Sequence, residues 1–365
     1  MTTPLRSRFL RAAPCAVTLL ALMLMASCTT LGPTSVQRDR FDYNAAVSDS
    51  WKDQTLLNIV KLRYADMPLF IEVSSIVSGY TLEQLVNLTG TVVEGSLPNA
   101  GTLGAQAKYI DRPTITYQPI TGGQFNKTFL KPIPPSAILF LIQAGWPADI
   151  VLPITVEAIN GLHAPRNVGA RMQEGDSEYD RVIELLAGIQ RAGALGMRVE
   201  HTDEDEMDST LMMIRRDRVP PEVEDARSEL AELLKLDREA LEYTIAYGEV
   251  ASEDDELAML TRSILSIMIE LAGEVRVPPE HIEDGRVPAA LADLDPTAPH
   301  RLIDIRSSED RPDDAFVMIR YDEHWFWIDH SDYASKRTFA YLMLLFSLTE
   351  SGTDQGLPLV TIPAG

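Results

Sequence analysis

The fold class is decided by the stretch LEYTIAY at residues 241–247, where large apolar side chains alternate with polar or small ones. Strict alternation is typical of a strand that is buried on one face. Helical patterns flank it, one over Glu222–Leu234 and one over Leu257–Leu271, the second after a capping box formed by Ser252 and Asp255. We therefore expect an α+β fold with mixed helices and a mostly antiparallel sheet.

The same mixture of helices and strands continues outward from this stretch. Apolar residues at helical spacing from Val182 to Ile189 predict an amphipathic helix that stops at Gly193. The other elements expected in this half are two strand pairs, Leu195–Glu200 with Leu211–Arg215 and Phe316–Tyr321 with His324–Asp329, and a helix from Ser331 or Asp332 to Thr349. We expect both strand pairs to be hairpins.

The patterns nearer the N-terminus are weaker. They predict a helix over Tyr43–Tyr64, strands over Leu69–Tyr80 and Pro113–Pro119, and a helix over Ser136–Ala144. The segment Thr89–Arg112 is dominated by small residues, and we favour a flexible excursion over a thin hairpin there. No element is assigned to Ile150–Ile159, which is apolar but contains Pro153, and a turn is expected at Asn160-Gly161.

Acidic residues are concentrated in the second half of the chain. The net charge is −22, and from Arg171 to Gly365 there are 43 acidic and 19 basic residues. Between Cys28 and Ala170 the signs nearly balance, with 11 acidic and 10 basic residues. This change predicts a near-neutral α+β domain at residues 41–170 and an acidic α+β domain at 171–365. Such an acidic half argues against nucleic acid as a partner.

The first 27 residues have the composition of a secretion signal. Arginines precede an apolar run from Ala16 to Ala26, which is shorter than a bilayer span. Met25-Ala26-Ser27-Cys28 then resembles the lipobox of bacterial lipoproteins. The alternative is an ordinary secreted protein that is cut near Ala26, with Cys28 unmodified.

The lipobox resemblance implies a location. In that family the signal, here residues 1–27, is removed, and the cysteine receives acyl chains such as palmitate. Cys28 would thus be the membrane anchor, followed by an acylated tether at residues 28–40. Thr29 stands where an Asp would favour the inner membrane, so the resemblance implies the outer membrane and its periplasmic face. Two or more acyl chains are enough for durable anchoring.

The sequence contains no linear motif of catalysis or nucleotide binding. It has no G-x-S-x-G, H-E-x-x-H, C-x-x-C or G-x-x-x-x-G-K. The acidic run Asp203–Asp208 lacks the glycine and the final glutamate of an EF-hand loop, so we expect a solvated loop. Gly122-Gly123 after a strand is interpreted as a turn rather than an anion cradle.

One polar cluster resembles a set of metal ligands: His324, Asp329, His330 and Asp332 lie within nine residues. Strand alternation, however, places Asp329 on the opposite face from His324 and His330. We therefore interpret these residues as the polar end of a hairpin followed by a helix cap at Asp332. Accordingly, we predict no catalytic residue, no metal ligand and no cofactor, and an enzyme is the less favoured interpretation.

Trp325 and Trp327 form the candidate interaction surface. Alternation places both on one face of a strand, with Phe326 and Ile328 on the other. Either the tryptophans pack in the core against the helix that contains Phe339, or their face binds a partner. Because a hairpin and the helix that follows it usually share a core, we favour packing.

Several segments together resemble a family of uncharacterised proteobacterial envelope lipoproteins. They are FDYN at residues 41–44, LNIVKLRYAD at 57–66, GWP at 145–147, NGL at 160–162 and WFWID at 325–329. The resemblance implies a location and no activity. Our leading functional hypothesis is a binding or scaffolding component of an envelope assembly with an envelope protein as partner. The alternative is a periplasmic hydrolase with its site in the cleft between the two domains.

Overall fold

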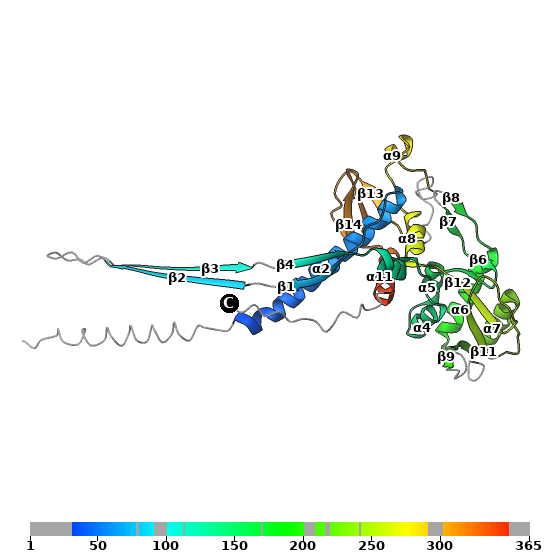
Figure 1. Cartoon of the computed structure of the whole chain (residues 1–365). Helices are drawn as coiled ribbons and strands as arrows, with labels where there is room; N and C mark the ends of the chain where they lie inside the picture. Colours follow the sequence, from blue (N-terminus) through cyan, green and yellow to red (C-terminus); the bar gives the residue numbers. More distant parts are fainter. Residues whose placement is uncertain are drawn as a thin grey trace, which may run out of the picture. The chain divides into compact units, whose positions relative to one another are not determined.

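The computed structural model describes residues 31–77, 80–90, 101–111, 114–168, 171–200, 209–215, 220–240, 242–290 and 302–349 (Figure 1). Cys28, the expected signal peptide at residues 1–27 and the acidic run 203–208 lie outside these residues. The chain divides into two compact units, Met1–Trp51 and Lys52–Gly365. Among the helices described, none combines the length and the apolar character needed to cross a bilayer.

The first helix, α2, spans Leu31–Arg63 and begins earlier than expected. From Leu31 onward, the segment expected as a tether is therefore helical. Pro33 does not prevent the helix, because a proline in the first turn removes no intrahelical hydrogen bond. In the second unit, α2 buries Leu56, Ile59 and Val60 completely.

Two antiparallel strand pairs follow. β1 (Ile71–Val77) pairs with β4 (Thr114–Pro119), and both lie within the segments predicted as strands. Between them, β2 (Tyr80–Gly90) pairs with β3 (Gly101–Asp111) along its whole length. In the described residues of this segment, the expected flexible excursion is thus wrong and the strands of the thin hairpin are present, because the backbone groups of small residues pair across strands as well as those of bulky ones.

Short helices connect these strands to the main sheet. They are α3 (Gly122–Phe125), the π-helix η1 (Asn126–Leu130), α4 (Pro135–Gln143) and α5 (Ala148–Thr155). Gly122 and Gly123 begin α3 instead of forming a simple turn. The unassigned segment Ile150–Ile159 is divided between α5 and a strand, with Pro153 inside the helix.

The main sheet has six strands in the order β6-β5-β12-β11-β10-β9. The strands are β5 (Val156–Ile159), β6 (Leu162–His163), β9 (Leu195–Glu200), β10 (Ser209–Ile214), β11 (Glu242–Tyr247) and β12 (Glu256–Thr261). Every neighbouring pair is antiparallel except β11 and β12. Because strands from both sides of Ala170 share this sheet, the division into two domains at that residue is not confirmed.

Helices pack on this sheet. α4 contacts β9, β11 and β12, and α6 (Ser177–Arg191) lies beside α5 and α7 (Pro221–Leu234) (Figure 1). The helix predicted over Leu257–Leu271 is wrong in its first part, which forms β12. The helix α8 (Ile264–Ala272) begins after Ser263, whose side chain accepts a hydrogen bond from the backbone N–H of Ser266. A small hairpin of β7 (Arg166–Val168) and β8 (Arg171–Gln173) packs near α8.

The C-terminal elements are α9 (Pro279–Glu283), β13 (Arg306–Ser308), β14 (Ala315–Tyr321), β15 (His324–Asp329) and α11 (Tyr333–Thr349). The three strands form an antiparallel sheet in the order β13-β15-β14. The predicted hairpin and final helix are confirmed, and α11 buries Phe339, Leu342 and Phe346. The fold is α+β with mostly antiparallel sheets.

Candidate functional site

Trp325 and Trp327 lie on the same face of β15, the central strand of the three-stranded sheet. Burial alternates along this strand: His324, Phe326 and Ile328 are buried, whereas the two tryptophans are only half-buried. Phe326 packs edge-on against the ring of Tyr64, with 6.1 Å between the centroids. The tryptophans are therefore less buried than the favoured core packing predicts, and the Phe326 face provides the fully buried contact.

Arginines flank the two tryptophans. Across the strand pairs, Trp327 lies opposite Arg306 of β13, and Trp325 lies opposite Arg320 of β14. Directly paired residues share a face of a sheet. The Arg311 guanidinium also lies over the Trp325 ring, 5.5 Å from its centroid. We call these five residues the Trp–Arg face.

Buried and half-buried carboxylates hold Arg306 in place. Its Nε donates to Asp304 Oδ2 at 2.8 Å, and its Nη1 donates to Asp329 Oδ2 at 3.0 Å. The hydrogen bond to Asp304 is the main cause that raises the pKa of Arg306 above its ordinary value. Arg276 makes a second ion pair with Asp304 at 2.7 Å. Arg306 is thus a fixed cation beside Trp327, which reduces the entropy lost when a partner binds.

A groove of about 460 Å³ runs along β13 next to this face. Its lining includes Arg276, Glu280, Arg306, His324 and Trp327. Cationic, aromatic and imidazole groups therefore open into one hollow. Such a set is suited to recognition, because large rigid rings and arginines are the side chains that dominate binding energy at protein interfaces.

The structure separates the polar cluster that the sequence places within nine residues. The Asp329 carboxylate accepts from Ser331 and Arg306, and Asp332 accepts from the Ser335 backbone N–H at 3.1 Å, as the expected helix cap of α11. His324 instead contacts Glu280 and His281 of α9. His281 has no signal in the sequence, because only the tertiary fold brings α9 to β15.

Part of the Trp–Arg face was accessible from the sequence. A two-residue turn between the predicted strands Phe316–Tyr321 and His324–Asp329 places Arg320 opposite Trp325 by counting alone. Arg306 was not accessible in this way, because β13 is a three-residue strand with no pattern of its own, and Arg311 lies between β13 and β14 rather than on a strand.

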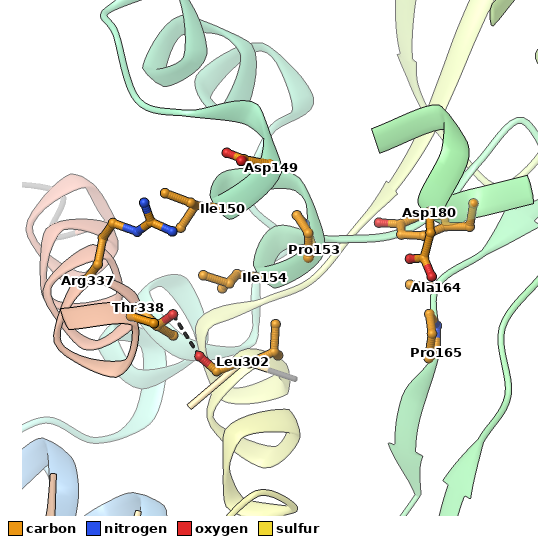
Figure 2. Close-up of a pocket in the computed structure, with 12 residues that line it drawn as sticks. Asp149, Ile150, Pro153, Ile154, Ala164, Pro165, Asp180, Leu302, Arg337 and Thr338 are labelled. Carbon is orange, nitrogen blue, oxygen red and sulfur yellow. Dashed lines mark hydrogen bonds between the residues drawn. The ribbon is translucent and has the colours of Figure 1, made fainter. Parts of the chain in front are cut away.

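A second hollow, of about 290 Å³, lies among α5, α6 and α11. Figure 2 shows Arg337 reaching from α11 toward Ile150, while Thr338 donates a hydrogen bond to the Leu302 carbonyl at 2.9 Å. Asp149 and Asp180 are the other charged residues in its lining. The described residues that line it include no histidine, serine or cysteine, and the Thr338 hydroxyl donates to a backbone carbonyl rather than to a base.

The shifted carboxylates are also unlike those of an acid–base catalyst. Among the described residues, Asp176, Glu229 and Asp329 have carboxyl groups whose pKa is lowered. The main cause is a hydrogen bond in each case: from the His163 backbone N–H to Asp176, from Arg181 to Glu229, and from Ser331 to Asp329. These groups are ionised at neutral pH. A general acid requires the opposite shift.

Comparison with known proteins does not identify a function. Comparisons of the chain with protein-family models, with curated proteins and with solved structures found no match. The Trp–Arg face is therefore the feature of the molecule that bears most directly on its function.

Proposed function

We propose that the protein is an outer-membrane lipoprotein, anchored through lipid on Cys28, that binds an envelope protein in the periplasm through the Trp–Arg face. The lipobox-like sequence Met25–Cys28 supports the anchor. The periplasmic orientation rests on Thr29 and on the acidic second half of the chain, which anionic headgroups would repel.

The observation that carries the binding role is the half-buried pair Trp325 and Trp327 on a sheet whose opposite face is already core. Leaving two indole rings partly in water costs free energy that burial against a partner recovers. Arg306, Arg311 and Arg320 surround the rings with donors for carboxylates and carbonyls of that partner. Tryptophan and arginine are the residue types most enriched among interface hot spots.

Crosslinking in native membranes tests the binding role. The Trp325→Ala/Trp327→Ala double variant should lose the crosslinked partner, with an affinity loss of about 30-fold or more from a hot-spot cost of about 2 kcal/mol. Because both rings are half-buried, the folded state should persist, which circular dichroism and thermal unfolding would verify.

Tyr247→Ala is the matched control. This tyrosine is 54% exposed on β11, in a different sheet, so its loss removes an exposed aromatic ring without touching the Trp–Arg face. The control should retain the partner. Retention of the same partner by the double tryptophan variant would refute the proposed binding surface.

Cys28→Ala tests the anchor. This change should release the protein from the membrane fraction or leave the signal uncleaved, because the thiol that would carry the lipid is gone. Fractionation and mass determination of the N-terminus would measure both outcomes. A processed Cys28→Ala protein that stays tightly bound to membranes would contradict lipid anchoring.

A further inference from the structure

Two histidines from distant parts of the sequence meet beside the groove. The rings of His281 on α9 and His324 on β15 are nearly perpendicular, at 82°, with 4.9 Å between their centroids. Glu280 completes the group, with Oε1 3.0 Å from His324 Nε2. One ligand atom from each of these three residues lies within 4.8 Å of the other two. Both histidines are buried, whereas the Glu280 side chain is half-exposed.

The outer nitrogens of both rings are held by oxygen atoms. His324 Nδ1 lies 3.2 Å from the Asp322 backbone carbonyl, which only accepts, so Nδ1 carries a proton and Nε2 faces Glu280. His281 Nδ1 lies 2.7 Å from the Tyr64 hydroxyl. Metal-binding histidines are commonly oriented in this way, with the second ring nitrogen donating to an oxygen.

A cation already occupies part of this cluster. Arg286 Nη1 lies 3.0 Å from His281 Nε2 and 2.8 Å from Asp322 Oδ2. Since the guanidinium only donates, His281 Nε2 must present a lone pair, which fits the direction of its pKa, lowered chiefly by burial. The Arg286 side chain is 47% exposed, and its Nε pairs with Asp284 Oδ2 at 2.7 Å. That ion pair can keep the guanidinium at the surface when another cation displaces it from His281.

We propose that Glu280, His281 and His324 bind one Zn²⁺ ion, with the Asp322 carboxylate or a water molecule as the fourth ligand. The ion would replace the Arg286 guanidinium at His281 Nε2 and the direct contact between His324 Nε2 and Glu280 Oε1. Two imidazoles and a carboxylate suit zinc, whereas Ca²⁺ and Mg²⁺ prefer oxygen ligands alone. Zinc would join α9 to the start of β15, at the edge of the groove next to Trp327.

Zinc titration of the purified, tag-free full chain against a chromophoric chelator tests this assignment. The wild-type protein should bind one Zn²⁺ per chain, and its melting temperature should rise with zinc. His324→Ala and Glu280→Gln should each abolish stoichiometric binding. Tyr64→Phe, which removes the oxygen that orients His281, should weaken binding by about 10- to 100-fold.

His163→Ala is the matched control. Its two ring nitrogens face Asp176 at 3.3 Å and Glu249 at 3.0 Å, on opposite sides of the ring, so these acids do not converge on one ion. Binding should survive this change. The assignment is overturned if the wild type fails to bind zinc stoichiometrically, or if His324→Ala and Glu280→Gln bind as the wild type does. Because the Glu280 side chain is half-exposed, Glu280→Gln should fold even if a histidine variant does not. Zinc binding by Glu280→Gln therefore tests the assignment by itself.

Discussion

At the scale of single residues, Asn160 shows how one side chain ties elements together. Its backbone has a φ of +45°, a conformation that asparagine tolerates better than most residues. Its Nδ2 donates to the carbonyls of Leu234 and Glu256, and its Oδ1 accepts from the Ala258 N–H at 2.7 Å. The turn that the sequence indicates at this position therefore also connects β5 to α7 and β12.

Asn160→Ala should lower the free energy of unfolding by about 2–4 kcal/mol, since it removes three hydrogen bonds and leaves alanine at a positive φ. Asn160→Asp keeps the acceptor for Ala258 but loses both donated bonds, so its effect should also be destabilising. Urea unfolding measures both variants. A loss below about 0.5 kcal/mol for the alanine variant would show that the bridge contributes little.

Asp329 gives a residue-scale prediction for acid stability. Hydrogen bonds from Ser331, and then Arg306, lower its pKa below the ordinary value of 3.8. As the pH falls, the unfolded chain thus takes up this proton first. The stabilisation is complete above about pH 4 and is lost as the pH falls toward the lowered pKa. Asp329→Asn should flatten the decline of unfolding free energy in this acid range, measured by urea unfolding at several pH values.

Asp313→Asn, at an exposed position, is the control for the removal of one negative charge. An equal flattening in this variant would contradict the assignment of the effect to Asp329.

At the scale of elements, Arg262 decides where α5 ends. The last carbonyls of a helix have no partner within it. The buried Arg262 Nη1 donates to the carbonyls of Pro153 and Ile154 in this last turn, and to that of Val156 at the start of β5. One side chain between β12 and α8 therefore stabilises the change from helix to strand that the sequence left unassigned.

Arg262→Met should lower the free energy of unfolding by about 3 kcal/mol or more, because three carbonyls, two of them in buried bonds, lose their donor while the volume is roughly kept. Arg262→Lys retains a charge but not the planar group, so it should recover only part of the loss. Hydrogen exchange across Ala148–Ile159 would locate the effect. Unchanged protection in this segment would mean that Arg262 does not hold the end of α5.

At the scale of the whole molecule, the six-stranded sheet connects both halves of the sequence. β5 pairs with β12 through Ile159 and Met259. A fragment of residues 171–365 would lose β5, β6, α4 and α5, and would expose β12 as an edge. We expect this fragment to lack a cooperative unfolding transition, and a fragment of residues 52–365 to keep one. Calorimetry of both compares them directly, and a cooperative transition in 171–365 would restore the domain boundary at Ala170.

The sequence by itself determined the elements whose signal is local. The helices α6, α7 and α11 follow from the spacing of apolar residues, and the hairpin of β14 and β15 follows from the alternation of side chains. Both patterns can be seen in the sequence because residues close together in the chain form the amphipathic face. The same alternation placed Trp325 and Trp327 on one face.

Only the tertiary structure decided those features that depend on contacts between residues far apart in the sequence. Leu257–Leu271 is largely apolar, so its periodicity could not separate strand β12 from helix α8; the pairing of β12 with β5 and β11 did. Tyr64 packs against Phe326 and so decides which face of β15 belongs to the core. The packing of α9 against β15 likewise brings His281 into contact with His324. Such contacts have no local signature, because the free energy that selects them comes from surfaces that approach one another only once the chain has folded.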